Sequence, residues 1–409
     1  MTSTQKPIQR GKLFLITLGH FWIDSYANIQ PALLPLVILQ MDLSLTLAGI
    51  LASVFSLSSS LTQTVMGYLA DRMRVRYFVV LGLLFSAVFI CSIGLASDYW
   101  TLLVILALGG LGISAFHPQT VTMAGEISGS HRGLGVSLFV AGGTAGYALS
   151  PYWITVLVSE YSIDILPYAA IPGIVTVGLL MWLVPMAKEP HEHAPSFTIR
   201  EAFQGRLRPI MLLTSTVIAR SVTRLGMMAF LPIMLTSQGM TLVDGGKALT
   251  TFTFLGAIGS LVGGTLSDRI GRRMIITLSM VGSGPLLYAA LQSEGGLFFL
   301  LLGLGGFMLF LADAVVVATA QELAPERAAI ASSMVMGFGW GIGGLAVMAV
   351  GGLSDAIGIP ATLSGVALIP VVGAVCCFGL PKDSVAPYFP EPAIDSTDPE
   401  KPSEKIAQR

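Results

Sequence analysis

The sequence predicts an all-α membrane protein with twelve transmembrane helices in two pseudo-symmetric six-helix bundles. Of its 409 residues, 54% are hydrophobic and 11% are charged, and the mean hydropathy is +0.78, which excludes an ordinary soluble protein. In addition, the segment Gly67–Arg72 returns 197 positions later as Gly264–Arg269. A repeat of this length in such a hydrophobic chain indicates two homologous membrane halves.

Apolar runs of about 20 residues, the length of one membrane crossing, follow one another through both halves. We predict the spans at 13–39, 43–70, 77–96, 99–123, 133–158, 165–186, 209–236, 243–267, 273–292, 296–320, 328–353 and 360–380. The predicted domains are an N-terminal bundle (1–186), a charged cytoplasmic linker (187–208), a C-terminal bundle (209–380) and a proline-rich, disordered cytoplasmic tail (381–409).

The basic residues predict the orientation of these spans. With the N-terminus inside, 19 of the 22 Lys and Arg residues fall on one side of the membrane. Cytoplasmic loops carry such an excess, so both termini are expected in the cytoplasm. The first apolar stretch is long and lacks a small-residue cleavage site, so we expect no cleavable signal peptide. The three cysteines lie in apolar spans without metal-ligand spacing, and we expect neither a metal nor a cofactor.

Several polar and ionisable residues are placed deep within the spans, where each charge costs about 2.5–3.5 kcal/mol on insertion scales. They are His20, Asp24 and Asn28 in the first span, His117 in the fourth, Arg220 and Arg224 in the seventh, and Asp313 in the tenth. Successive members on the first and seventh spans are four residues apart, so each set shares one helix face. We predict that these seven residues bind the substrate.

The internal repeat relates these residues in pairs. An offset of 196 maps Asp24 onto Arg220, and His117 onto Asp313; it also maps Asn28 onto Arg224. One alternative is that Asp24 and Arg220 form only a structural salt bridge between the bundles. Another is that His117 simply bonds to the backbone of its span. Asp313 has no obvious cationic neighbour in the sequence, so we predict Asp313, His117 and Asp24 as proton carriers.

A second group of charges lies at the cytoplasmic ends of the spans. It comprises Asp71, Arg72, Glu126, Arg132, Asp268, Arg269, Glu322 and Arg327. We predict that these residues form gate networks that hold one conformation. The alternative is that they are only solvated at the membrane interface.

Several of these motifs resemble those of a known family. Gly-x-x-x-Asp-Arg followed by basic residues resembles the loop 2–3 signature of the major facilitator superfamily of secondary transporters, although Arg74 stands where the family usually has glycine. Within that superfamily, the chain resembles the fosmidomycin resistance proteins in His20-x-x-x-Asp24, Phe116-His117-Pro118 and Gln321-Glu322-Leu323 followed by a glycine-rich stretch. The resemblance implies that spans 1, 4, 7 and 10 line a central cavity.

The same resemblance implies proton-coupled export of fosmidomycin-like phosphonates or other toxic small organic compounds from a bacterium, across its inner membrane. Arg220 and Arg224 are suited to a phosphonate, because guanidinium presents paired donors in a fixed fork. The expected partners are an anionic small molecule, protons and the lipid bilayer, with the chain acting as a monomer. The alternative is a proton-coupled importer or facilitator of a metabolite anion. An enzyme is not expected, because the sequence offers no nucleophile–base pair.

Overall fold

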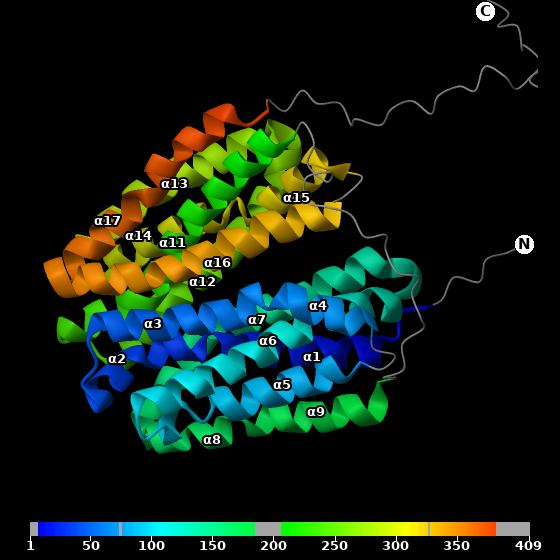
Figure 1. Cartoon of the computed structure of the whole chain (residues 1–409), viewed down its shortest axis with the longest axis horizontal. Coiled ribbons are helices and arrows are strands. Elements are labelled where there is room, and N and C mark those ends of the chain that lie inside the picture. The colour runs from blue at the N-terminus through cyan, green and yellow to red at the C-terminus, as the bar shows by residue number, and fades with distance from the viewer. Residues whose placement is uncertain (1–6, 73–75, 185–205, 326–327, 382–409) are drawn as a thin grey trace, which may run out of the picture.

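The computed structural model describes residues 7–72, 76–184, 206–325 and 328–381, and the secondary structure in these ranges is helical (Figure 1). The helices of the first half are α1 (Arg10–Ala27), α2 (Ile29–Met41), α3 (Leu45–Ser56), α4 (Gln63–Arg72), α5 (Tyr77–Ile90), α6 (Tyr99–Ile127), α7 (Arg132–Tyr161), α8 (Leu166–Ala169) and α9 (Ile171–Leu183). Those of the second half are α11 (Leu207–Ser237), α12 (Leu242–Ile270), α13 (Arg272–Leu291), α14 (Gly295–Phe310), α15 (Asp313–Leu323), α16 (Ala328–Ile357) and α17 (Ile359–Gly373).

The helices confirm the predicted membrane fold. Within the described residues, ten helical stretches are long and apolar enough to cross a membrane, and α5 is a shorter apolar helix. The first predicted span is present as two helices, α1 and α2, which meet at Asn28. Pro31 explains this break, because proline has no N–H to donate to the carbonyl of Ala27 and its ring clashes with that carbonyl. The sequence analysis did not anticipate the division.

Two other spans also depart from a regular α-helix. The tenth span is interrupted by a turn at Leu311 and Ala312, which separates α14 from α15. The second span contains a π-helical turn, Leu57–Leu61, between α3 and α4. Within this turn the Ser58 hydroxyl donates to the carbonyl of Phe55, three residues earlier. Such irregular turns redirect side chains, and they occur often at functional sites.

Polar caps fix where several helices begin. The carboxylate of Asp98 accepts hydrogen bonds from the main-chain N–H groups of Trp100 and Thr101, at 2.9 and 3.1 Å, at the start of α6. Hydrogen bonds from Thr101 lower the pKa of Asp98 to about 2. At the start of α12, Thr241 and Asp244 form a reciprocal capping box. These caps satisfy main-chain N–H groups that the helices leave without partners at their first turns.

The helices gather in two bundles, with α1–α9 in one and α11–α17 in the other (Figure 1). The bundles contact each other mainly where α3 packs on α16 and α7 packs on α12. Glycine permits the first contact, since a Cβ atom at Gly49 would lie 2.8 Å from the carbonyl oxygen of Val347. The predicted domain boundaries remain predictions, because most of the linker and of the tail lies outside the described residues.

The hydrogen bonds between the bundles concentrate toward one end of the molecule. We call the end that contains the α2–α3 and α16–α17 connections the far end, and the end that contains the α4–α5 and α12–α13 connections the basic end (Figure 1). Asp355 on α16 accepts hydrogen bonds from the N–H groups of Leu45 and Thr46, at 3.0 and 2.8 Å. On α3, the Ser53 hydroxyl donates to the carbonyl of Gly344 at 2.7 Å. These contacts tie the bundles together from the far end inward.

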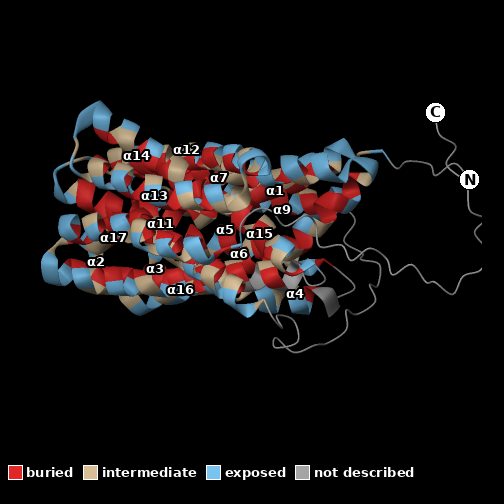
Figure 2. Cartoon of the chain, turned by 90° about the horizontal axis from the view of Figure 1, so that it is seen from above, coloured by how far each residue is buried: buried red, intermediate tan, exposed pale blue. Residues whose placement is uncertain are grey.

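The outer surface of the bundles is apolar. Trp182, Leu261 and Val372 are 80%, 73% and 74% exposed, while the buried residues run along the inside of the helices (Figure 2). Exposed apolar residues on this scale are typical of a surface that faces lipid rather than water.

Candidate functional site

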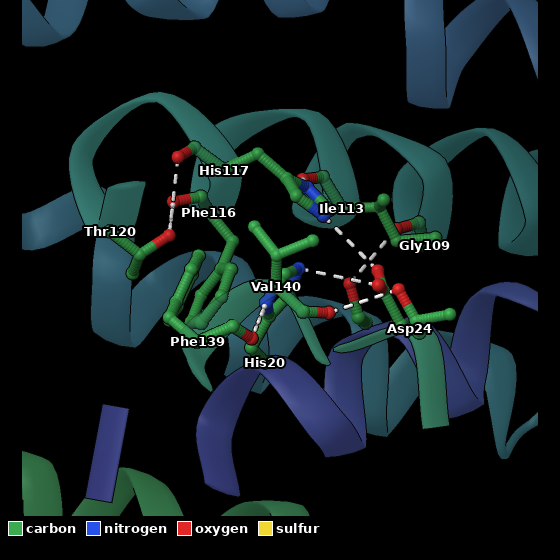
Figure 3. Close-up of polar contacts among 11 residues, drawn as sticks. His20, Asp24, Gly109, Ile113, Phe116, His117, Thr120, Phe139 and Val140 are labelled. Atoms are coloured by element: carbon green, nitrogen blue, oxygen red, sulfur yellow. Dashed lines mark hydrogen bonds and ion pairs between the residues drawn. The ribbon is translucent and has the colours of Figure 1, made fainter. Parts of the chain in front are cut away.

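The first bundle contains a cluster of two histidines and one carboxylate, shown in Figure 3. His20 and Asp24 lie one turn apart on α1, and His117 projects toward them from α6. Nε2 of His20 lies 3.2 Å from Oδ2 of Asp24, and Nε2 of His117 lies 3.1 Å from Oδ1. The side chains of His117 and Asp24 keep 20% and 19% of their surface exposed, against 7% for His20. The cluster is therefore buried on the His20 side and reachable on the other.

Main-chain carbonyl groups hold both imidazole rings in place. Nδ1 of His20 donates to the carbonyl of Phe139 at 2.8 Å, and the two rings are stacked with centroids 4.0 Å apart. Nδ1 of His117 donates to the carbonyl of Ile113 at 2.8 Å, one turn earlier on the same helix. Both rings consequently present Nε2 to Asp24 in a fixed orientation.

The second bundle contains a cluster of two arginines and one carboxylate. Arg220 and Arg224 lie one turn apart on α11, and Asp313 is the first residue of α15. Arg220 forms a buried ion pair with Asp313 and also donates twice to the carbonyl of Leu309, at 3.0 and 2.6 Å. The interruption between α14 and α15 brings Asp313 to a helix N-terminus, where a negative charge is stabilised.

Arg224 is bound far more loosely than Arg220. Its Nη1 lies 3.6 Å from Oδ2 of Asp313, and its Nε has no hydrogen-bond partner among the described residues. Aromatic rings surround its guanidinium carbon, with the centroid of Phe310 at 4.4 Å, that of Tyr147 at 5.4 Å and that of Trp340 at 6.0 Å. The Tyr147 side chain also lies within hydrogen-bonding reach of Arg224, so the donor without a partner among the described residues is the buried Nε.

A pocket opens beside this cluster. It is lined by Val217, Arg220, Ser221, Arg224, Leu309, Phe310, Asp313, Val316, Met336 and Trp340. All of these residues come from α11, α14, α15 and α16 of the second bundle. The lining combines two positive charges and one negative charge with apolar and aromatic surface.

The structure corrects two expectations about the buried charges. Asp24 does not pair with Arg220 as the bundle-to-bundle salt bridge requires, since Asp24 contacts His117 and Arg220 contacts Asp313. The expectation that Asp313 has no cationic neighbour is also wrong. The cause is that the α1–α6 and α11–α15 pairs each lie within one bundle, so the closest partner of each charge belongs to its own repeat.

The two pairs occupy repeat-related positions with the charges exchanged. Asp24 and His117 are 93 residues apart, and so are Arg220 and Asp313. In the first bundle the carboxylate is Asp24, on the first span. In the second bundle it is Asp313, on the fourth span of that bundle. Asn28 is not in either cluster: its amide donates to the carbonyl of Tyr147 at 2.7 Å, at the break between α1 and α2.

At the basic end, the charged residues form a second pair of repeat-related contacts. Arg76 pairs with Glu126 in the first bundle. In the second, Arg272 contacts Asp268 at 2.6 Å and Glu322 at 3.1 Å. The set of predicted gate residues omitted Arg76 and Arg272, although the same offset of 196 relates them in the sequence.

The remaining predicted gate residues are less engaged or lie outside the structure. Arg132 and Arg269 are exposed, and the Arg132 side chain passes beside Gly125. The side chains of Asp71 and Arg72, and all of Arg327, lie outside the described residues.

The family can now be assigned from comparisons with known proteins. The sequence profile of the Major Facilitator Superfamily matches residues 13–248 and 212–406, which together cover almost the whole chain. The chain belongs to the Major Facilitator Superfamily. Its members are transporters, so the protein is a multi-pass membrane transporter of a small molecule and not an enzyme.

Among curated superfamily members, the chain is 28% identical to the uncharacterized MFS-type transporter YfnC of Bacillus subtilis, over 91% of this chain and 93% of that protein. It is 27% identical to the fosmidomycin resistance protein of Escherichia coli, over 92% and 94%. It is 26% identical to a probable 4-methylmuconolactone transporter of Cupriavidus pinatubonensis, over 91% and 90%. The resemblance predicted from the motifs is confirmed.

Solved structures of other transporters share the fold. A bacterial homologue of the human lysosomal transporter Spinster, described as inward-facing and occupied, gives a TM-score of 0.78 at 14% identity and covers 91% of this chain and 97% of that chain. A point mutant of the nucleoside transporter NupG gives 0.73 at 14% identity and covers 90% and 99%. At this level of identity the likeness concerns the fold alone.

Proposed function

We propose that the protein is a proton-coupled antiporter that exports fosmidomycin-like phosphonates or other toxic small organic compounds by alternating access. The observation that carries the proposal is the loosely paired Arg224 in a pocket that also contains Arg220. An oxyanion in this pocket would receive paired, charge-assisted hydrogen bonds, and the aromatic rings would pack against an apolar body. The relation to the fosmidomycin resistance protein supports phosphonates as the class to test first.

For orientation, we propose that the basic end faces the cytoplasm in a bacterial inner membrane, with both termini on that side. The excess of Lys and Arg supports this arrangement. The far-end contacts between the bundles would then close the outer side, so the described conformation corresponds to an inward-facing transporter. Transport would proceed by rocking of the bundle at 1–186 against the bundle at 209–380.

Asp313 is the proposed proton carrier. Of the three predicted carriers, it alone contacts the arginines that would bind substrate. A coupled transporter requires a group whose proton affinity differs between the two facing states. An arriving anion would compete with Asp313 for Arg224 and Arg220, so its charge state and substrate occupancy would depend on each other.

The Asp313 contact taken alone favours a second candidate, proton-coupled uptake of a metabolite anion, whereas the exchange direction rests on the relation to the fosmidomycin resistance protein. A carboxylate displaced from arginine by an anion loses the charges that stabilise its ionised form, and it then takes up a proton more readily. Anion and proton would bind together, which is the requirement for cotransport in one direction.

A transport assay in proteoliposomes of known orientation separates the two candidates. Fosmidomycin transport is measured under an imposed pH gradient while a dye reports internal pH. Export by exchange predicts substrate accumulation in vesicles that are acidic inside, with protons leaving as substrate enters. Cotransport predicts accumulation in vesicles that are alkaline inside, with protons entering alongside substrate. If fosmidomycin is neither bound nor moved, while other organic anions are, the phosphonate assignment is wrong.

A further inference from the structure

In the His20–Asp24–His117 cluster, two neutral imidazole rings would lack a hydrogen between Nε2 and the Asp24 carboxylate. Each imidazole places Nδ1 2.8 Å from a main-chain carbonyl oxygen. A carbonyl oxygen only accepts, so Nδ1 carries the hydrogen in both rings. Nε2 of a neutral ring with that tautomer is an acceptor.

Both Nε2 atoms nevertheless face the Asp24 carboxylate, one at each oxygen (Figure 3). Acceptors that face a carboxylate at close range require a cation between them, either a proton or a metal ion. The Nε2–Oδ separations of 3.1 and 3.2 Å lie at the long end of the roughly 2.7–3.2 Å range of an N–H···O hydrogen bond. Tetrahedral zinc, with bonds of about 2.0–2.2 Å, holds neighbouring nitrogen and oxygen ligands about 3.4 Å apart.

We propose that His20, Asp24 and His117 bind a divalent transition-metal ion. One potential ligand atom from each residue lies within 4.8 Å of the others. The carbonyl contacts of both Nδ1 atoms provide the outer hydrogen bonds that metal-bound histidines usually make, and they fix the ligating tautomer. This site is separate from the arginine pocket of the second bundle, and it leaves Asp313 as the proton carrier.

The ligand set indicates which ions fit. Two imidazoles and one carboxylate favour Zn²⁺, Co²⁺ or Ni²⁺, whereas Mg²⁺ and Ca²⁺ prefer oxygen ligands. Three protein ligands leave at least one coordination position for water or another small molecule. The exposure of His117 and Asp24 places that position on the reachable side of the cluster. His20 and Asp24 are four residues apart on α1, but the third ligand, His117, follows 93 residues later on α6, so the sequence spacing alone does not indicate a three-ligand site.

Zinc binding to the purified protein tests the site. The chain has five histidines, at 20, 117, 131, 191 and 193, so a background with His131, His191 and His193 replaced by Gln retains only the two in the cluster. This background, carrying no histidine tag, should bind one Zn²⁺ per chain by equilibrium dialysis. Bound Co²⁺ should give the intense visible absorption of a four-coordinate nitrogen and oxygen site.

Variants of the background then identify the ligands. Asp24→Asn and His20→Gln should each weaken zinc binding by more than the roughly 10- to 100-fold that loss of an outer-shell partner costs. Asp313→Asn, which removes the repeat-related carboxylate, should leave zinc binding unchanged.

Three outcomes would overturn the proposal. The first is that the background does not bind zinc although its melting curve matches that of the wild-type protein. The second is that Asp24→Asn binds zinc as tightly as the background. The third is a Co²⁺ spectrum with sulfur charge-transfer bands, which would move the ion to a cysteine. If His20→Gln fails to fold, the stoichiometry and spectrum of the background decide the question.

Discussion

At the scale of single residues, Arg220 and Arg224 differ although they occupy successive turns of one helix. Arg220 is 5% exposed, and its guanidinium donates hydrogen bonds to Asp313 and to the carbonyl of Leu309. Arg224 has one weak ion pair and a guanidinium stacked among aromatic rings. We therefore propose that Arg220 shapes the pocket and that Arg224 contacts the substrate.

Arg224→Ala should lower phosphonate affinity by about 10- to 100-fold, because a charge-assisted contact worth about 1.5–3 kcal/mol is lost. Arg224→Lys should restore only part of it, since the fork of donors is gone. Binding is measured by calorimetry on detergent-solubilised protein, with Lys247→Ala at the far end as the control for general loss of positive charge. Wild-type affinity in Arg224→Ala would remove this residue from the site.

Arg220→Ala should reduce thermal stability as well as binding. It leaves the Asp313 carboxylate without its closest partner and removes two hydrogen bonds to the carbonyl of Leu309. Breaking a buried pair by removing one partner costs about 3–5 kcal/mol. Melting curves of Arg220→Ala and Arg224→Ala should therefore differ, with the larger loss for Arg220→Ala. Equal melting temperatures would contradict the structural role of Arg220.

Asp313→Asn should keep substrate binding and counterflow exchange but lose accumulation driven by a pH gradient. Asparagine preserves the shape of the side chain and cannot exchange a proton. The measurement is proton movement on substrate addition in proteoliposomes, with Glu160→Gln, an exposed far-end acid, as the matched control. Proton movement with substrate at the wild-type ratio in Asp313→Asn would place the carrier elsewhere.

At the scale of elements, the contact between α3 and α16 joins the bundles through a helix end. The N-terminal N–H groups of a helix are unsatisfied by the helix itself and carry partial positive charge. Asp355 of the second bundle accepts from the Leu45 and Thr46 N–H groups of the first, and from the Thr46 hydroxyl at 2.5 Å. This cap holds only while the far ends are together, so opening that side must break it.

Asp355→Ala should shift the transporter toward the state with the far end open. A lost cap costs about 1–2 kcal/mol, which corresponds to a change of roughly 5- to 30-fold in the ratio of the two states. Distances between spin labels on the far ends of α3 and α16 measure the shift. Thr46→Val removes only the hydroxyl contact and should have a smaller effect in the same direction. An unchanged distance distribution in Asp355→Ala would show that this cap does not stabilise the closed far end.

At the scale of the whole molecule, the buried and basic-end charges of each bundle pair with residues of the same repeat. The mid-depth pairs and the basic-end pairs each recur at the same sequence separations in both bundles, 93 and 50 residues. Each pair ties helices of one bundle together, so the bundle can move as a unit. Contacts between the bundles include close approaches at glycine, the Ser53–Gly344 hydrogen bond and the Asp355 cap, and they allow close packing that can separate again.

Arg272→Ala should slow transport while leaving equilibrium substrate binding nearly unchanged. Arg272 joins the end of α12 to α15 through Asp268 and Glu322, far from the arginine pocket. The acids are exposed, so the effect on overall stability should be within about 1 kcal/mol. Arg76→Ala removes the repeat-related contact and should behave similarly. Loss of binding with a normal rate of conformational exchange would contradict a gating role.

The sequence alone determined the number of spans, their approximate bounds, the internal repeat and the depth of the ionisable residues. These features depend on local composition and on helical periodicity, which can be read along the chain. The offset of 196 also relates Arg76 to Arg272 in the sequence. Only the structure shows that both arginines contact a glutamate.

The tertiary structure decided which charges meet. Sequence position suggested that Asp24 pairs with Arg220, whereas packing of α6 on α1 brings His117 to Asp24, and the break before α15 brings Asp313 to Arg220. The contrast between Arg220 and Arg224, and the exposure of both Nε2 atoms to one carboxylate, were likewise decided by packing. Ion pairing depends on which helices pack together and on atomic separations of a few ångströms, and neither quantity is encoded in the spacing along a single helix.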